Sequence, residues 1–144
     1  DELIDDTQKR TRESVWEIDE LSKLHHHKSI ILKKEKKYKE EFVNRIKSYC
    51  LDGIAMTHKF PKKTDKSFSD ETYDREVKRI RSIVKNLADH QNLMTFINKN
   101  LKKIKLTEDQ KRQLAGFMMK MILLEHNDEV YKSLKELNKL FENL

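Results

Sequence analysis

The segment Leu24-His25-His26-His27-Lys28 determines where the first helix of this chain is expected to end. Three consecutive histidines fit poorly on a helix, because neighbouring residues point in different directions and cannot share one buried or one solvated face. We therefore predict that Leu24–Lys28 forms a turn between two helices, with Ser29 as the N-cap of the second. In a bundle whose helices run up and down, a third connection at residues 102–105 lies at the same end as this turn.

The composition predicts an all-α fold. The 144 residues contain only 2 Gly and 1 Pro, whereas a β-rich domain needs many more of these residues for its turns. Hydrophobic residues are 36% and charged residues 39%, which is typical of long amphipathic helices with solvated outer faces. The length fits a single domain, residues 1–144, with one hydrophobic core.

Hydrophobic periodicity predicts four helices. We expect them at about residues 2–24, 29–60, 69–101 and 107–144. Thr107 and Gln110 form a capping-box sequence at the start of the last helix. The apolar pattern of that helix is interrupted at His126–Asp128, by either a kink or a restart. The simplest arrangement is an antiparallel up-down four-helix bundle with a long, kinked or overhanging C-terminal helix.

Three further residues carry local predictions. Ser69 is expected to cap the third helix after a loop that begins at Pro61. Gly53 lies inside the second helix, where it costs about 1 kcal/mol relative to Ala, and we expect it to let a neighbouring helix approach closely. Cys50 is the one cysteine, so no intrachain disulfide is possible, and we expect it to be a small buried hydrophobe.

The sequence contains no motif of an enzyme or of a cofactor site. It lacks Gly-x-Ser-x-Gly, a glycine-rich phosphate loop and His-Glu-x-x-His. His25–His27 have no third ligand at metal-binding spacing, so a solvated turn is favoured over a metal site. Nucleic-acid binding is disfavoured, because acids interleave with the lysines of most helices and the turns lack stacking aromatics. We therefore expect a binding protein without catalytic residues, cofactor or metal.

The predicted first and third connections bring cationic side chains to one end of the bundle. These residues are Lys23, Lys28, Lys33, Lys99, Lys102, Lys103 and Lys105, together with the three histidines. No Asp or Glu occurs from Leu21 to Lys34 or from Phe96 to Leu106, although the charges alternate elsewhere and the net charge is +6. One interpretation is ordinary solvated lysine near helix C-termini. The other is a one-signed patch that attracts an acidic partner.

Short strings of the sequence resemble one family of bacterial surface proteins. Trp16-Glu17-Ile18-Asp19, the lysine-rich second helix and Tyr49-Cys50-Leu51-Asp52-Gly53-Ile54 are similar to the C-terminal domain of the borrelial fibronectin-binding lipoproteins. The resemblance implies a monomeric helical bundle within a longer lipoprotein, held on the outer face of the outer membrane by an upstream lipid anchor. It also implies that the domain binds and inhibits the initiating trypsin-like serine protease of the classical complement pathway.

In this family, basic residues of the first and third connections carry the inhibition, and one of them enters the acidic specificity pocket of the protease. The positions that match by location are Lys28, His27, His26, Lys102, Lys103 and Lys105. The family has Arg in the first connection where this chain has Lys28. A trypsin-like pocket accepts either residue, so we expect Lys28 to be the residue that enters the pocket. A second hypothesis is a surface adhesin module that binds a sulfated glycosaminoglycan, or another acidic host ligand, through the same lysines.

Overall fold

The described part of the chain is all-helical, with short connections between its helices. The computed structural model describes residues 2–58, 69–124 and 127–142, with side chains from Trp16 onward. Its helices are α1 (Glu2–Lys34), α2 (Tyr38–His58), α3 (Asp70–Leu87), α4 (His90–Asn100), α5 (Glu108–Ile122) and α6 (Asn127–Glu142). These ranges contain no strand, so the all-α prediction is confirmed. None of the described helices is both long and apolar enough to cross a membrane.

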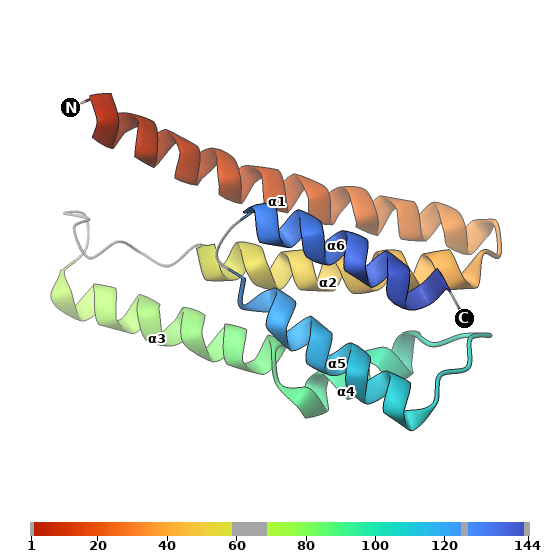
Figure 1. Ribbon diagram of the computed structural model, residues 1–144. Coiled ribbons are helices and arrows are strands. Elements are labelled where there is room, and N and C mark those ends of the chain that lie inside the picture. The colour runs from red at the N-terminus through yellow and green to blue at the C-terminus, as the bar shows by residue number, and fades with distance from the viewer. Residues whose placement is uncertain (1, 59–68, 125–126, 143–144) are drawn as a thin grey trace.

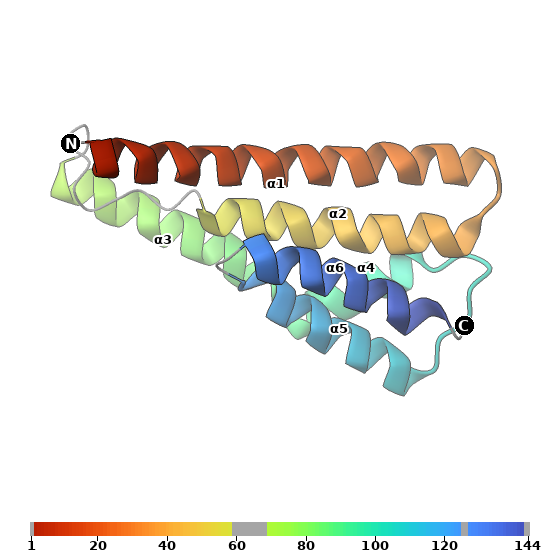
Figure 2. The same cartoon turned by 45° about the horizontal axis from the view of Figure 1, so that its top comes forward.

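Helix α2 lies at the centre of the arrangement. Among the described helices it is the one that contacts all the others. Figure 2 shows α1 along one side of α2, with α3 and α5 on the other. The buried residues of α2 accordingly lie all round the helix, and Phe42, Ile46, Leu51 and Ile54 are each at most 1% exposed. A helix that is buried on every side is expected for the central element of a helical core.

The predicted turn at Leu24–Lys28 is wrong, because α1 continues through this segment. His25 is buried against α2, and its Nδ1 lies 2.8 Å from the side-chain oxygen of Asn44. Ser29 is buried too, and its hydroxyl donates to the carbonyl of His26 at 2.6 Å instead of capping a second helix. His25 fits within the interface because its partner on α2, Asn44, is polar, whereas His26 and His27 are exposed to solvent.

Helix α1 ends at a tight turn that precedes Tyr38. The N–H of Lys37 donates to the carbonyl of Leu32 at 2.9 Å, and the N–H of Lys36 donates to the carbonyl of Lys33 at 3.1 Å. These two bonds form a Schellman motif, whose left-handed position is usually glycine. Lys36 occupies that position, with a φ of 61°. The first connection is therefore Glu35–Lys37.

The predicted third helix is interrupted between α3 and α4. The carboxylate of Asp89 accepts the N–H of Asn92 at 3.1 Å and so caps α4. The Asn92 side chain donates to the carbonyl of Asn86 at 2.9 Å, and the Tyr49 hydroxyl donates to the carbonyl of Leu87 at 2.9 Å. These bonds satisfy the backbone groups that a helix break leaves without partners.

The predicted last helix is two helices. Helix α5 ends at Ile122, and α6 runs back in the opposite direction (Figure 1). Leu140 and Phe141 near the end of α6 consequently line the same hollow as Leu106 before α5. The prediction of a single overhanging C-terminal helix is therefore wrong. The chain starts a new helix at Asn127. Residues 125–126 lie outside the described residues. The described residues thus form six helices where four were predicted.

The predicted helix starts at Ser69 and Thr107 are confirmed. The hydroxyl of Ser69 accepts the N–H of Thr72 at 3.2 Å. Thr107 and Gln110 form both bonds of a capping box. The rest of the loop predicted from Pro61 to Ser69 lies outside the described residues.

Gly53 allows α5 to pack closely against α2. A Cβ atom at this position would lie 2.9 Å from Cγ2 of Ile122, closer than side-chain atoms normally approach. The expected role of Gly53 in close helix packing is therefore confirmed. Cys50, one turn earlier, is fully buried as predicted.

Candidate functional site

The turn between α1 and α2 and the connection between α4 and α5 lie side by side at one end of the molecule (Figures 1 and 2). A cation–π contact joins them, because the Lys103 ammonium lies 5.1 Å from the centroid of the Tyr38 ring. The prediction that Leu24–Lys28 meets residues 102–105 is wrong, because Leu24–Lys28 lies within α1; the turn between α1 and α2 lies beside residues 102–105 instead. We call residues 35–40 and 101–107 the basic end.

A hollow of about 440 Å³ separates the two connections at the basic end. Lysines from both connections and from the first turn of α2 line it: Lys36, Lys37, Lys39, Lys103 and Lys105. Tyr38 and Ile104 supply apolar surface, and Glu40 supplies the one carboxylate among the described lining residues. Several ammonium groups around a small space produce a positive potential that attracts an acidic group.

The basic end is less uniformly positive than the sequence predicted. Glu35 lies in the turn, and its carboxylate is 3.4 Å from the ammonium of Lys37. Glu40 and Glu41 follow in the first turn of α2. The acid-free stretch that ends at Lys34 belongs to α1 and not to the connection. The expectation of an acid-free end is therefore wrong, although lysines still outnumber acidic residues at the basic end.

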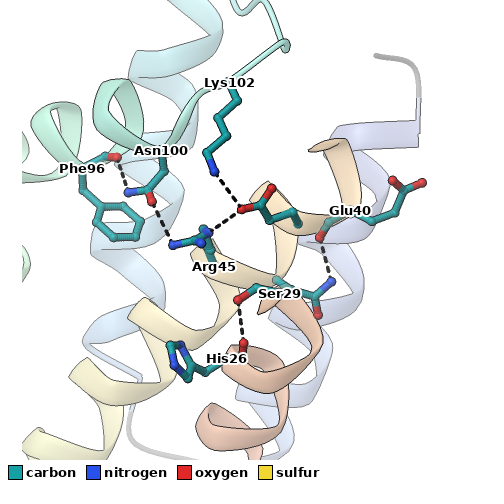
Figure 3. A network of polar contacts seen from close by, with 9 residues as sticks. His26, Ser29, Glu40, Arg45, Phe96, Asn100 and Lys102 are labelled. Carbon is teal, nitrogen blue, oxygen red and sulfur yellow. Dashed lines mark hydrogen bonds and ion pairs between the residues drawn. The ribbon is translucent and has the colours of Figure 1, made fainter. Parts of the chain in front are cut away.

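A buried carboxylate holds the connection between α4 and α5 against α2 (Figure 3). The side chain of Glu41 is 3% exposed and lies 3.1 Å from Nε of Arg45 and 3.4 Å from Nζ of Lys102. Arg45 also reaches the side-chain oxygen of Asn100 at 3.5 Å, and Asn100 donates to the carbonyl of Phe96 at 2.8 Å. Lys102 is thus tied to α2, and its charge is partly neutralised there.

Lys105 is presented on a short segment that is anchored on both sides. Its side chain is exposed, whereas the neighbouring Ile104 and Leu106 are half-buried and pack against the hydrophobic core. Leu101 has extended backbone angles at the end of α4, and the Thr107 capping box starts α5. The segment between them is too short to move far from the bundle. It therefore displays Lys105 in a restricted position.

The predicted site residues of α1 are not part of the basic end. His26, His27 and Lys28 are exposed on the surface of a regular helix, and the two imidazole rings are 5.9 Å apart. Lys28 precedes Lys36 by eight residues, about 12 Å along a helix axis. The structure brings Lys102, Lys103 and Lys105 together with the α1–α2 turn. It does not bring the three predicted α1 residues there.

Three lysines of the basic end were missed: Lys36, Lys37 and Lys39. A signal for them is present, because residues 33–37 are five consecutive charged residues between Leu32 and Tyr38. A gap of this length exceeds the three- or four-residue spacing of a buried helix face and is typical of a helix end.

The described residues contain no group of three or more His, Cys, Asp or Glu side chains placed to hold a metal ion. Comparison of the chain with protein-family models, with curated proteins and with solved structures gave no match.

Proposed function

We propose that this protein is a complement evasion protein that binds and inhibits a trypsin-like serine protease, the initiating protease of the classical complement pathway, with its basic end. The resemblance of the Trp16–Asp19 and Tyr49–Ile54 strings to the borrelial lipoproteins supports the protease as partner. The lysine-rich hollow supports an acidic surface on that partner. Inhibition by occlusion requires no catalytic residue in this chain.

The observation that carries the proposal is the exposure of Lys105 between two anchored neighbours. A trypsin-like pocket contains a carboxylate at its base and accepts one extended basic side chain. Because Ile104 and Leu106 already fix the segment, binding orders few additional groups and loses little conformational entropy. The Lys105 ammonium then forms a charge-assisted contact with the buried carboxylate of the pocket. Lys105, and not Lys28, is the residue that we assign to the pocket.

The remaining predicted residues have supporting roles in this proposal. Lys103 and the lysines of the α1–α2 turn attract acidic loops beside the pocket and raise the association rate. Lys102 positions the connection through Glu41. His26, His27 and Lys28 lie farther along α1, where they contact the partner only at the edge of the interface.

The proposed orientation on a cell follows from an antiparallel up-down order of the helices. Helix α1 starts at the opposite end of the molecule from the basic end (Figure 1). A lipid-anchored segment upstream of α1 would therefore place the basic end away from the outer membrane. A soluble host protease could reach it there.

The test is inhibition of the purified active protease by single-residue variants. We expect Lys105→Ala to weaken inhibition about 30-fold or more, because truncation of a central anchoring residue costs 2 kcal/mol or more. Lys105→Arg should retain inhibition, since the pocket accepts either side chain. Lys139→Ala on α6, another exposed lysine, is the matched control and should inhibit like the unmodified protein. Equal inhibition by Lys105→Ala and the unmodified protein would exclude the assignment.

A second candidate function is binding of a sulfated glycosaminoglycan, favoured by the five lysines around the hollow. Such binding depends on summed charge and weakens as salt screens it. Elution from immobilised heparin should then shift by a similar small amount for each lysine replaced at the basic end. A large effect of Lys105 alone, without a matching shift for Lys103, supports the protease instead.

A further inference from the structure

Lys47 is a buried cation on α2, outside the basic end. Its exposed fraction is 8%, and none of the ion pairs within the described residues includes it. Burial lowers the pKa of Lys47, and the positive charge of Lys28 on α1 lowers it further. A lysine whose side chain is largely withdrawn from water, with no ion-pair partner among the described residues, gains from an anion that reaches its ammonium.

Lys47 lines a second hollow, of about 250 Å³, between α2 and the last turns of α6. Val43 and Phe141, which are 8% and 4% exposed, supply apolar wall. Asn138 is exposed, also lines the hollow, and its side-chain amide offers a hydrogen-bond donor. The volume is below the roughly 300–1,000 Å³ of most pockets for drug-sized molecules, which restricts the occupant to a small molecule.

The charges around the hollow restrict the occupant further. The lining also includes a second ammonium, that of Lys39, and two carboxylates, those of Glu40 and Glu142. These two carboxylates repel a multiply charged anion such as phosphate or a sulfated chain, whereas a single carboxylate can reach Lys47 with less repulsion. The apolar wall favours a ligand with a hydrocarbon part next to its charge.

We propose that the hollow at Lys47 binds a small monocarboxylate with an apolar tail. Its carboxylate pairs with the Lys47 ammonium, and its tail covers Val43 and Phe141. The site shares Lys39 and Glu40 with the hollow at the basic end, but the residues that hold the ligand, Lys47, Val43 and Phe141, lie outside the basic end. Variants of Lys47 therefore test this site separately from the proposed protease inhibition.

The experiment uses sodium hexanoate as the probe and the full chain labelled with nitrogen-15. We expect saturable shifts of the Val43, Asn44 and Asn138 amide resonances, and a higher melting temperature with hexanoate, because a ligand that binds the folded state stabilises it. Hexan-1-ol, which has the same tail without the charge, should produce no saturable shift. Inorganic phosphate should produce none either.

Two variants test the residue assignment. Lys47→Met keeps the length of the side chain, removes the unpaired charge, and should weaken hexanoate binding about tenfold or more. Asn138→Trp should block the opening without changing a buried residue, and so gives a second readout if Lys47→Met does not fold. Lys135→Met on the exposed face of α6 is the control and should bind like the unmodified protein. Equal hexanoate binding by Lys47→Met and the unmodified protein, or no saturable shift at all, overturns the proposal.

Discussion

Replacement of Glu41 by Gln tests how the basic end is held together. The substitution keeps the shape of the side chain but removes the charge that Arg45 and Lys102 share. The amide still offers one oxygen, but its NH₂ group faces cations that cannot accept its hydrogens. We expect Glu41→Gln to loosen the contact between α2 and the connection that carries Lys105.

The magnitude follows from the burial of the three partners. Removal of one member of a fully buried ion pair costs about 3–5 kcal/mol, whereas an exposed pair contributes about 1 kcal/mol or less. Glu41 is 3% exposed, but Arg45 and Lys102 are 29% and 39% exposed, so both cations recover part of their hydration. We therefore expect a loss of about 2 kcal/mol in the free energy of unfolding. In a domain of this size it lowers the melting temperature by about 6 °C.

The assay is urea denaturation followed by circular dichroism, with protease inhibition measured on the same samples. Glu40→Gln is the matched control, because Glu40 is exposed on the same turn of α2 and should change stability by less than about 0.5 kcal/mol. Inhibition by Glu41→Gln should weaken at a temperature at which the protein remains folded. Equal stability of the two variants would refute the argument that Glu41 organises the connection.

The structure makes further predictions for pH and for the two glycines. Burial lowers the pKa of His25 below its ordinary value of 6.5, so the unfolded chain binds the proton first and stability is lost as the pH falls below about 6.5. His25→Gln should flatten this dependence in denaturation curves at pH 7.5 and 5.5, whereas the exposed His27→Gln should preserve it. Gly53→Ala should destabilise the protein by about 1–3 kcal/mol, since its Cβ meets Ile122. Gly116→Ala, whose Cβ meets nothing within 4 Å, should stabilise it by about 1 kcal/mol, and thermal melts compare the two.

The sequence predicted those parts of the fold that depend on local chemistry. Ser69 and Thr107 are capping residues whose side chains act on the backbone three residues ahead, so adjacent residues identify them. Gly53 was recognisable because glycine inside a helix is costly unless it serves packing. The all-helical class followed from the scarcity of turn residues.

The predictions that were wrong have several physical causes. The sequence could not show that His25 suits a helix interface, because its partner Asn44 lies 19 residues away on another helix. The end of α1 was missed because Lys36 occupies the left-handed position where glycine would have marked it. Asp89 was read as part of a continuous helix, although aspartate is also a favourable N-cap.

The candidate site was predictable in one half and not in the other. Lys102, Lys103 and Lys105 stand before a recognisable helix start, so their placement in a connection followed from Thr107. The first connection was misplaced by ten residues, and Lys28 was given a role that its position on α1 does not favour. The burial of Glu41 could not be predicted, because its two partners come from different elements.

The most direct test of the central claim is competition between this protein and benzamidine, a small cation that occupies the specificity pocket of trypsin-like proteases. Binding of the protein to immobilised active protease is measured at increasing benzamidine concentration. If Lys105 enters the pocket, the two ligands exclude each other, and the apparent affinity falls in proportion to pocket occupancy. The residual binding of Lys105→Ala should be insensitive to benzamidine. Simultaneous binding of benzamidine and the unmodified protein, with unchanged affinity, would contradict the account.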